Sequence, residues 1–534
     1  MERLSVRRFF LPGLAVGIAS WLSAYILYPQ LRVFELGLPS LRRVLALPVN
    51  QEALWNSLIL SLATVLGALP LGAMLAWAVG VYRIPGRGWV QIVALWPLAL
   101  PPLIGVVALY LLLEGGWMAL HLPGMLAVWL VHVYALHPYG YLFTRARLEQ
   151  VDGAWWEAAA LLGVRGVRRF VRLTLPVFWP AWRRAALLIF LVSMSSFTAP
   201  LLFAFDERVL TTQIYYYKLN GDLPSASALS VVLVLVGLIL FGLLEGTVSP
   251  MKSASKGSPR PLRRSLSRTG RLLGGLFAGG YGLFVCAPLL LLFGFSFQEN
   301  PLQWLSSGLS RWTIRHYTDI LSRSEALQPL WSSFQMALLA TGAVLLTGVV
   351  VAYLARRLSG GRLLLALCLL PYALPGTVVG IQLLAAFSRP HPFTLSQVLV
   401  GTFWILPLAY FVRTLPLGVQ AAASGWEAVQ DRLLEAARTL GARRGYLWRR
   451  LVLPLLGPAL LGGGWLVFVQ AATEFVASIL LYTYANRPVS VEIFSYLRLF
   501  DFGGAAAYSV LLVVGLGGVS LFFRRPGRWM SGWG

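Results

Sequence analysis

The sequence predicts an all-α polytopic membrane protein with about twelve transmembrane helices, arranged as two tandem six-helix repeats. Three observations support this prediction. The 534 residues are 58% hydrophobic and only 12% charged, which excludes an ordinary soluble globular protein. The apolar residues fall into runs of about 20, the length that crosses a bilayer as a helix. A short polar pattern also occurs twice at a constant offset, which indicates an internal repeat.

The apolar runs predict where the spans lie. The first follows Arg3, Arg7 and Arg8, and we expect it to be an uncleaved span whose N-terminus faces the cytoplasm. The spans are expected near 9–28, 54–81, 89–113, 122–144, 183–205, 227–248, 272–297, 329–355, 362–387, 393–418, 460–484 and 505–523. Residues 1–248 then form the first repeat and residues 272–534 the second. A basic segment without acidic residues, 249–271, is the expected cytoplasmic linker.

The repeated pattern lies before the fifth span of each half. Its copies are offset by 278 positions, as from Glu157 to Glu435. The first copy is Glu157-Ala158-Ala159, Gly163 and Leu175-Pro176, and the second is Glu435-Ala436-Ala437, Gly441 and Leu453-Pro454. Glu-Ala-Ala favours a helix, and glycine accepts the left-handed angles that end one. We therefore expect a short helix, a glycine turn and a basic second helix, which proline ends.

This pattern resembles the signature loop of permease subunits of binding-protein-dependent ABC importers. The resemblance implies the type I importer permease fold and a bacterial cytoplasmic (inner) membrane location. It also implies that loops 150–181 and 428–459 couple to a separate cytoplasmic ATP-binding subunit, acting as a dimer. The implied coupling residues are Glu157, Ala158, Ala159, Gly163, Pro176, Glu435, Ala436, Ala437, Gly441 and Pro454. The alternative is a helical hairpin that lies on the membrane with its arginines toward lipid headgroups.

The placement of the charges supports the orientation. If both termini are cytoplasmic, most lysines and arginines fall in cytoplasmic segments, as the positive-inside rule requires. The net charge of +24 therefore points to the lipid bilayer and not to nucleic acid. The resemblance implies that a periplasmic or extracellular solute-binding protein docks on the longest external segments, which are 29–53, 206–226, 298–328 and 485–504. Ordinary solvated loops would have the same composition.

The sequence carries no sign of an enzyme. None of the three lysines follows a glycine, so the Gly-Lys-Ser/Thr of a nucleotide-binding P-loop is missing. Cys286 and Cys368 have no metal-ligand spacing, and the histidines form no HExxH. We expect no catalytic residue, metal or cofactor in this chain, and ATP would be bound by the partner.

Two features indicate the substrate pathway. Prolines around Pro101 and Pro375 interrupt corresponding spans, and broken helices in matching positions mark the pathway in repeat transporters. A kink packed against a neighbouring helix is the simpler explanation. Glu474 is the clearest ionisable residue within a span, where it would either favour a cationic substrate or serve as a hydrogen-bonded packing residue. Its counterpart in the first half is Ser196.

The substrate is suggested only by further resemblance. Residues 473–482 and 489–494 are similar to the iron(III) uptake branch of these permeases, so ferric iron is the expected substrate. Thiamine, phosphonate and polyamine permeases share the architecture. Outside this class, an ion-driven secondary transporter would need more intramembrane carboxylates. A membrane-embedded lipid enzyme would need a polar catalytic cluster at one membrane face.

Overall fold

The computed structural model describes residues 2–113, 122–245, 262, 265–301, 303, 310–358 and 360–523. Within these ranges the chain is largely helical, and an isolated β-bridge joins Gln298 and Trp312. The predicted all-α fold is confirmed. Most of the expected linker, together with residues 524–534, lies outside the described ranges.

The helices pack into two compact units, and each unit is discontinuous in sequence. Unit 1 consists of Met1–Val44, Ile214–Val234 and Thr313–Gly534, and unit 2 of Leu45–Gln213 and Leu235–Trp312. The first helices of the chain thus pack with the second repeat, and the first helix after the linker packs with the first repeat. The predicted division into repeats at 1–248 and 272–534 follows sequence similarity, and packing divides the chain differently.

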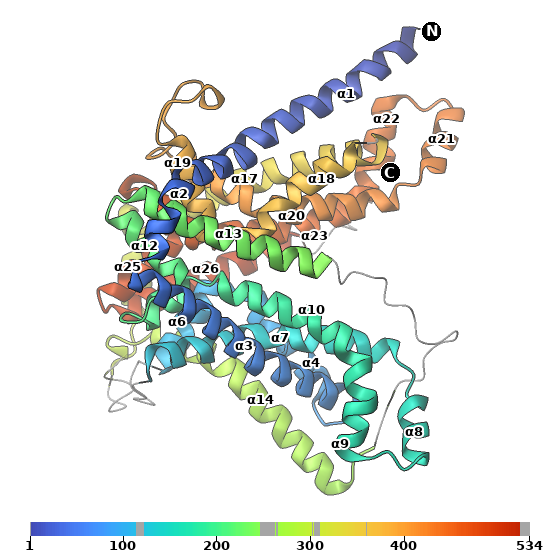
Figure 1. Ribbon diagram of the computed structural model, residues 1–534, viewed down its shortest axis with the longest axis vertical. Coiled ribbons are helices and arrows are strands. Elements are labelled where there is room, and N and C mark those ends of the chain that lie inside the picture. The colour runs from blue at the N-terminus through green and yellow to red at the C-terminus, as the bar shows by residue number, and fades with distance from the viewer. Residues whose placement is uncertain are drawn as a thin grey trace. The chain divides into compact units, whose positions relative to one another are not determined.

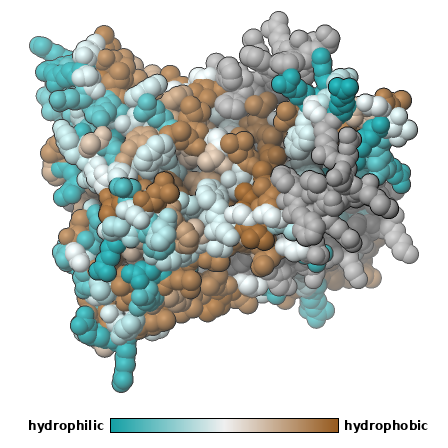
Figure 2. Space-filling view, turned by 90° about the horizontal axis from the view of Figure 1, so that it is seen from above, coloured by the Kyte–Doolittle hydropathy of each residue, from teal (hydrophilic) through white to brown (hydrophobic). Residues whose placement is uncertain are grey.

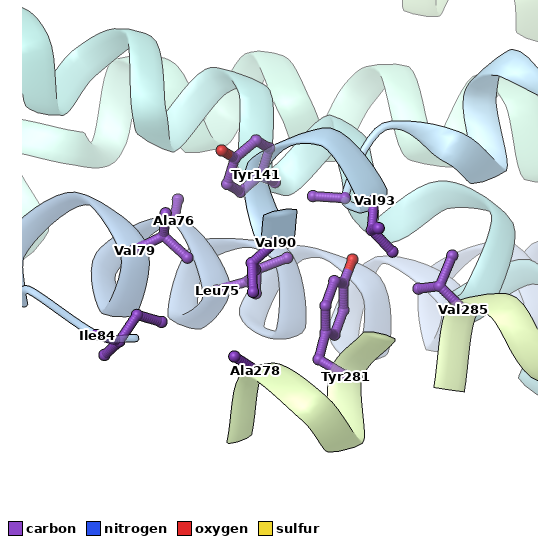
Figure 3. Packing of buried hydrophobic residues seen from close by; sticks show 11 residues of the cluster. Leu75, Ala76, Val79, Ile84, Val90, Val93, Tyr141, Ala278, Tyr281 and Val285 are labelled. Atoms are coloured by element: carbon purple, nitrogen blue, oxygen red, sulfur yellow. The ribbon is translucent and has the colours of Figure 1, made fainter. Parts of the chain in front are cut away.

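Unit 2 is built around α3, α7 and α10, which pack against one another. Its helices are α3 (Pro48–Val81), α4 (Arg87–Val93), α5 (Trp96–Ala99), α6 (Pro102–Leu113), α7 (Gly124–Gln150), α8 (Ala154–Leu161), α9 (Gly166–Arg169), a π-turn (Phe170–Thr174), α10 (Leu175–Met194), α11 (Thr198–Phe203) and α14 (Arg268–Phe295). α14 packs its Ala278 and Tyr281 side against Leu75, Val79 and Val90 in one apolar cluster (Figure 3). This cluster explains why α14 belongs to unit 2.

Unit 1 is built around α17, α20 and α23, the counterparts of α3, α7 and α10. Its first helices are α1 (Glu2–Leu22), a π-turn (Ser23–Leu27), α2 (Tyr28–Leu45), α16 (Arg315–Ser322), α17 (Ser324–Arg357), α18 (Gly361–Leu369), a 3₁₀ turn (Leu370–Ala373) and α19 (Gly376–Phe387). The rest are a 3₁₀ turn (Pro392–Thr394), α20 (Ile405–Ala428), α21 (Asp431–Thr439), α22 (Arg444–Leu447), a π-turn (Trp448–Val452), α23 (Leu453–Ala472), α24 (Val476–Leu481), a 3₁₀ turn (Tyr484–Asn486), α25 (Val489–Arg498) and α26 (Phe502–Phe523). Two further helices, α12 (Leu210–Leu219) and α13 (Leu223–Glu245), contribute residues to both units.

Nine helices in the described ranges are long and apolar enough to cross a membrane, and two bent helix pairs bring the number to as many as 11. α7 is 27 residues long but is not among them, because its histidines and tyrosines lower its hydropathy. The predicted number of about twelve therefore stays a prediction. Both bent pairs lie at the predicted proline breaks, with angles of 102° before Pro102 and 110° before Gly376.

Several predicted boundaries differ from the structure. The helices expected to begin at residues 183 and 460 begin at Gly166 and Gly445. The span expected from residue 393 begins at Ile405, and the expected external loop 29–53 is largely helical, because one helix continues from Leu11 to Leu45. Hydropathy marks only the part of a helix that lies in the hydrocarbon, and polar helical ends extend beyond it.

Large apolar side chains lie exposed on the helices. On α3, for example, Leu66 and Met74 are among the most exposed hydrophobic residues. Figure 2 shows hydrophobic residues over much of the face in view, with hydrophilic residues gathered toward its edge. In water such a surface would cause aggregation, whereas lipid tails solvate it, so the exposure fits a bilayer-embedded protein.

Candidate functional site

The first repeated loop has the backbone that its glycine predicts. α8 ends at Leu161, and Gly163 adopts a left-handed φ of +73°. The N–H of Gly163 donates to the Ala160 carbonyl, and the N–H of Val164 donates to the Ala159 carbonyl. This is a Schellman motif, which satisfies the last carbonyls of a helix when the residue after the cap is left-handed. The glycine turn is confirmed here.

The second loop repeats this geometry. α21 ends at Thr439, and Gly441 has a φ of +83°. Gly441 donates to the Arg438 carbonyl, and Ala442 donates to the Ala437 carbonyl. A Cβ at Gly163 or Gly441 would meet nothing within 4 Å, so the backbone angle alone calls for glycine at these positions.

The prediction that Leu-Pro ends the second helix of each loop is wrong. The helix continues through Pro176 to Met194 and through Pro454 to Ala472. A π-turn precedes each proline, so Leu175 donates to the Phe170 carbonyl and Leu453 to the Trp448 carbonyl. These wide turns contain one extra residue, which relieves the clash of a proline ring with the preceding turn. The loop is therefore continuous with the membrane-spanning part of α10 or α23.

The first helix of each loop buries one apolar residue against its unit. Trp156 of α8 packs in a cluster with Val151 and Phe178, and its ring lies 5.9 Å from that of Trp77. In the second loop the corresponding residue, Leu434, packs against Trp426 and Val452. Figure 1 shows α8 and α9 beyond the end of α10, and α21 and α22 beyond the end of α23.

The predicted coupling residues lie on the exposed side of these loops. Glu157 and Glu435 are exposed, as are the alanines that follow them, Ala158 and Ala436. Ala159 and Ala437 are half-buried. One exposed apolar residue precedes each glycine, Leu162 with 81% exposure and Leu440 with 88%. Each loop thus presents an acid and a leucine at the same two places.

The two loops differ in their charged contacts. Asp431 at the start of α21 lies 2.8 Å from Nη2 of Arg357 and 4.0 Å from Nη2 of Arg356. Arg356 also donates to the carbonyls of Trp426 and Val429. The position of Asp431 is Gly153 in the first loop, so these ion pairs belong to the second repeat.

Glu474 is paired, which the sequence did not reveal. Its Oε2 lies 2.8 Å from Nε of Arg413, and its Oε1 accepts from the Ala477 N–H at 2.9 Å. This geometry fits the hydrogen-bonded packing role that the sequence left open. Arg413 was missed because it lies near one end of the predicted span 393–418, where arginines are ordinary. In the structure the helix extends to Ala428, which places Arg413 well inside it.

The corresponding region of the first repeat has a cluster of one histidine and two serines. His132 Nε2 lies 2.8 Å from the Ser196 hydroxyl, and His132 Nδ1 lies 3.0 Å from the Ser193 hydroxyl. Histidine in this place did not stand out in the sequence, because a single histidine in a span has no pattern. Pro101 and Pro375 lie at the two helix breaks, and whether these line the pathway stays a prediction.

Three hydrogen bonds beyond the loops recur in both repeats, and a fourth polar contact recurs in altered form. The Ser57 hydroxyl accepts from the Leu210 N–H, as Ser333 does from Val489, both at 2.8 Å. The Thr211 hydroxyl donates to the Ser196 carbonyl, as Ser490 does to Glu474. Asp222 accepts from the Ser225 N–H, as Asp501 does from Gly504. Arg208 donates to Gln213 in the first repeat, and at the corresponding positions of the second repeat Arg487 forms an ion pair with Glu492. The internal repeat therefore extends to individual polar contacts.

The last of these pairs contains a perturbed carboxyl outside the candidate spans. Glu492 lies 2.7 Å from Nε of Arg487, and its side chain is 7% exposed. Burial raises the pKa of Glu492, and the Arg487 charge lowers it by a smaller amount. In the first repeat the position holds an amide, Gln213, which does not titrate.

Among the described residues, no group of three or more histidine, cysteine, aspartate or glutamate side chains is arranged to hold a metal ion. The free thiols of Cys286 and Cys368 lie on α14 and α18. The exposed sides of the two loops are therefore the strongest candidate for a functional site in this chain.

Comparison with known proteins agrees with this geometry. The model of a family described as "Binding-protein-dependent transport system inner membrane component" matches residues 344–528, which include the second loop. The Fe(3+)-transport system permease protein of Haemophilus influenzae is 26% identical, and the alignment covers 96% of this chain and 97% of that protein. The ferric transport system permease protein of Actinobacillus pleuropneumoniae is also 26% identical, over 96% of this chain and 78% of that protein.

A shorter relative matches at higher identity. The sulfate transport system permease protein of Salmonella typhimurium is 31% identical, and the alignment covers 44% of this chain and 85% of that protein. One such relative therefore corresponds to about half of this chain, as expected for a chain that contains two repeats.

Proposed function

Because the chain belongs to the family of binding-protein-dependent transport system inner membrane components, we propose that it imports ferric iron as the permease subunit of an ABC importer. Its class is that of a multi-pass inner-membrane permease. Two relatives that match along nearly the whole chain are ferric permeases by name, and this full-length match carries the proposal. The sulfate relative matches less than half of the chain, which makes sulfate the weaker candidate.

The two loops would couple transport to ATP hydrolysis on a separate cytoplasmic subunit, present as a dimer. Each loop has a rigid backbone, a buried anchor and an exposed surface, which are the properties of a docking element. A dimer of ATP-binding subunits offers two equivalent grooves, one for each loop. ATP would be bound by that subunit, so the permease would need no cofactor of its own. The solute-binding protein would dock at the opposite side of the membrane.

This arrangement requires both loops and both termini to face the cytoplasm. Impermeant maleimide labelling of Leu440→Cys and Tyr484→Cys tests it, because both positions are exposed. Leu440 follows α21 and Tyr484 precedes α25, and these two helices lie at opposite ends of unit 1 (Figure 1). The background would carry Cys286→Ser and Cys368→Ser. We expect Leu440→Cys to react only in inside-out vesicles and Tyr484→Cys only in right-side-out vesicles. The reverse result would overturn the orientation.

The substrate is tested by uptake into vesicles that contain the permease and its ATPase, supplied with its binding protein. Labelled ferric iron, thiamine, phosphonate, a polyamine and sulfate would be compared, and Glu435→Ala would serve as the coupling control. We expect ATP-dependent uptake of iron that is lost in the control. Uptake of another solute with the same dependence on Glu435 would keep the permease class and remove iron. Uptake without ATP would indicate a secondary transporter.

A further inference from the structure

Glu474 is fully engaged inside unit 1. Its side chain is 11% exposed and forms the ion pair with Arg413 of α20. Its second carboxylate oxygen caps α24 through the Ala477 N–H. Its backbone carbonyl accepts from the hydroxyls of Ser478 and Ser490 at 2.6 and 2.8 Å. Glu474 therefore joins the turn after α23 to both α20 and α25.

Gly376 makes room for the Arg413 side chain. A Cβ at Gly376 would lie 2.2 Å from Nη1 of Arg413, which no ordinary contact permits. Gly376 is the first residue of α19, directly after the 110° break. The start of a helix carries partial positive charge, so a guanidinium there needs a counter-charge. Glu474 supplies it, and the pair thereby ties the break to α20 and α23.

The first repeat lacks all three parts of this arrangement. The positions of Arg413, Gly376 and Glu474 hold Ala135, Pro102 and Ser196. Alanine carries no charge, serine provides no counter-ion, and a proline ring would fill the space that Gly376 leaves. A guanidinium at this place needs both the space and the counter-charge. The three differences between the repeats therefore depend on one another. Ser196 instead lies 2.8 Å from Nε2 of His132, which stands at the position of Tyr410.

The pair lies far from the second loop, with Arg413 on α20 and Glu474 in the turn that follows α23. α20 leads into α21, and α23 leads out of the π-turn that follows α22. At the loop end the two helices are held together by Trp426 and Leu456 of the apolar cluster around Leu434. From Arg413 to the end of α20 at Ala428 is about 22 Å, at 1.5 Å per residue. The helical hairpin is therefore fixed at both of its ends.

We propose that Arg413 and Glu474 are positioning residues that brace α20, α23 and the start of α19 into one rigid body. A displacement of the second loop then moves the Pro375–Gly376 break with it. The opposite charges compensate each other in place, so the pair transmits movement and does not bind substrate. This proposal rests on the coupling role proposed for the second loop.

The test uses the complete importer in lipid nanodiscs. Spin labels at Tyr372→Cys beside the break and at Tyr446→Cys in the second loop report the distance between these sites, since both side chains are exposed. The background again carries Cys286→Ser and Cys368→Ser. The test variant is Arg413→Met with Glu474→Gln, which removes both charges without leaving one unpaired. Ser196→Ala, at the position of Glu474 in the first repeat, is the matched control.

In the wild-type protein and in Ser196→Ala we expect one narrow distance distribution that ATP with vanadate leaves unchanged. In the double variant we expect normal abundance in membranes, a distribution at least twice as broad, and an ATP-dependent shift. Iron uptake per ATP hydrolysed should fall at least tenfold, while the KM for the loaded binding protein changes less than twofold.

Two results with the double variant would overturn the proposed brace. One is a double variant whose distribution stays as narrow as that of the wild type. The other is a selective rise in KM with unchanged uptake at saturation, which would make the pair a substrate site. The distance measurement needs no transported solute, so it remains informative if the wild-type importer does not carry iron. An ATP-dependent distance change in the wild type would contradict the rigid body itself.

Discussion

The loop of α8 and α9 and the loop of α21 and α22 share a backbone but differ in surface. Both have a Schellman turn at a left-handed glycine, a π-turn before a proline and one buried anchor. Around this frame the first loop exposes Leu161 and Val167, where the second has Thr439 and Gly445. The second loop adds the ion pairs of Asp431.

Features that both loops share are the ones that docking would require, and features of one loop alone are additions of that repeat. Identical grooves on a dimeric ATPase would bind the features that the two loops share. Those features are the backbone turn, the exposed glutamate and the leucine before the glycine. The charged residues of the second loop and the extra apolar residues of the first would then adjust the docking of each loop separately.

The largest effect is expected from Gly441→Leu and Gly163→Leu. A branched side chain in the left-handed region costs about 1–2 kcal/mol and would unwind the turn. We expect each variant to reach the membrane at normal abundance and to lose at least tenfold in coupled uptake. The matched control is Gly441→Asn, since asparagine tolerates this angle. Normal coupled uptake by the leucine variants would count against a coupling role for the turn.

The exposed leucines come next. Burial of a leucine in a partner stabilises by about 1.5–3 kcal/mol, so Leu162→Asp and Leu440→Asp should each weaken ATPase binding by tenfold or more. Co-purification of the ATPase at increasing salt measures this. Leu161→Asp is the control, because the second loop has Thr439 in its place. An equal loss with Leu161→Asp would show that the first loop docks through a surface of its own.

A smaller effect concerns pH and the buried carboxyl of Glu492 in α25. The folded protein raises the pKa of Glu492 and so binds its proton more tightly than the unfolded chain does. Stability from this residue is therefore present at low pH and declines as pH rises from about 4.3, the ordinary glutamate value, through the raised one.

Glu492→Gln copies Gln213 of the first repeat and should remove this dependence. Thermal unfolding in detergent between pH 4 and 8 would measure it, with Gln213→Glu as the reciprocal variant. We expect the variant curve to be flatter than the wild-type curve over this window. Identical curves would mean that another group controls the pH response.

The smallest effect is expected from Asp431→Asn. Asp431 and its arginine partners are substantially exposed, and such ion pairs contribute less than about 1 kcal/mol. The melting temperature should fall by less than about 2 °C, and coupled uptake should change less than twofold. A large loss of uptake would instead make the ion pairs of the second loop part of docking.

The local geometry that depends on single residues could be read from the sequence. Gly163 and Gly441 predicted the turns, because few residues accept a positive φ. The constant spacing of the two copies predicted the internal repeat. The continuation through Pro176 and Pro454 could not be read, because a π-turn forms without a sequence signature. Arg413 was overlooked because its partner lies 61 positions away, from 413 to 474, and only the fold brings them together.

The exchange of first helices has a consequence for synthesis. α1 and α2 pack with residues that follow Thr313, so they enter the bilayer before most of their partners exist. About 270 residues separate Val44 from Thr313. At a synthesis rate of about 5–20 residues per second, tens of seconds pass before the residues after Thr313 are made. During that time only residues 214–234 of their own unit can pack against them, as Ser227 of α13 does against Gly37 of α2. A gene split within the linker would therefore have to deliver both products to the same patch of membrane before either could complete its packing.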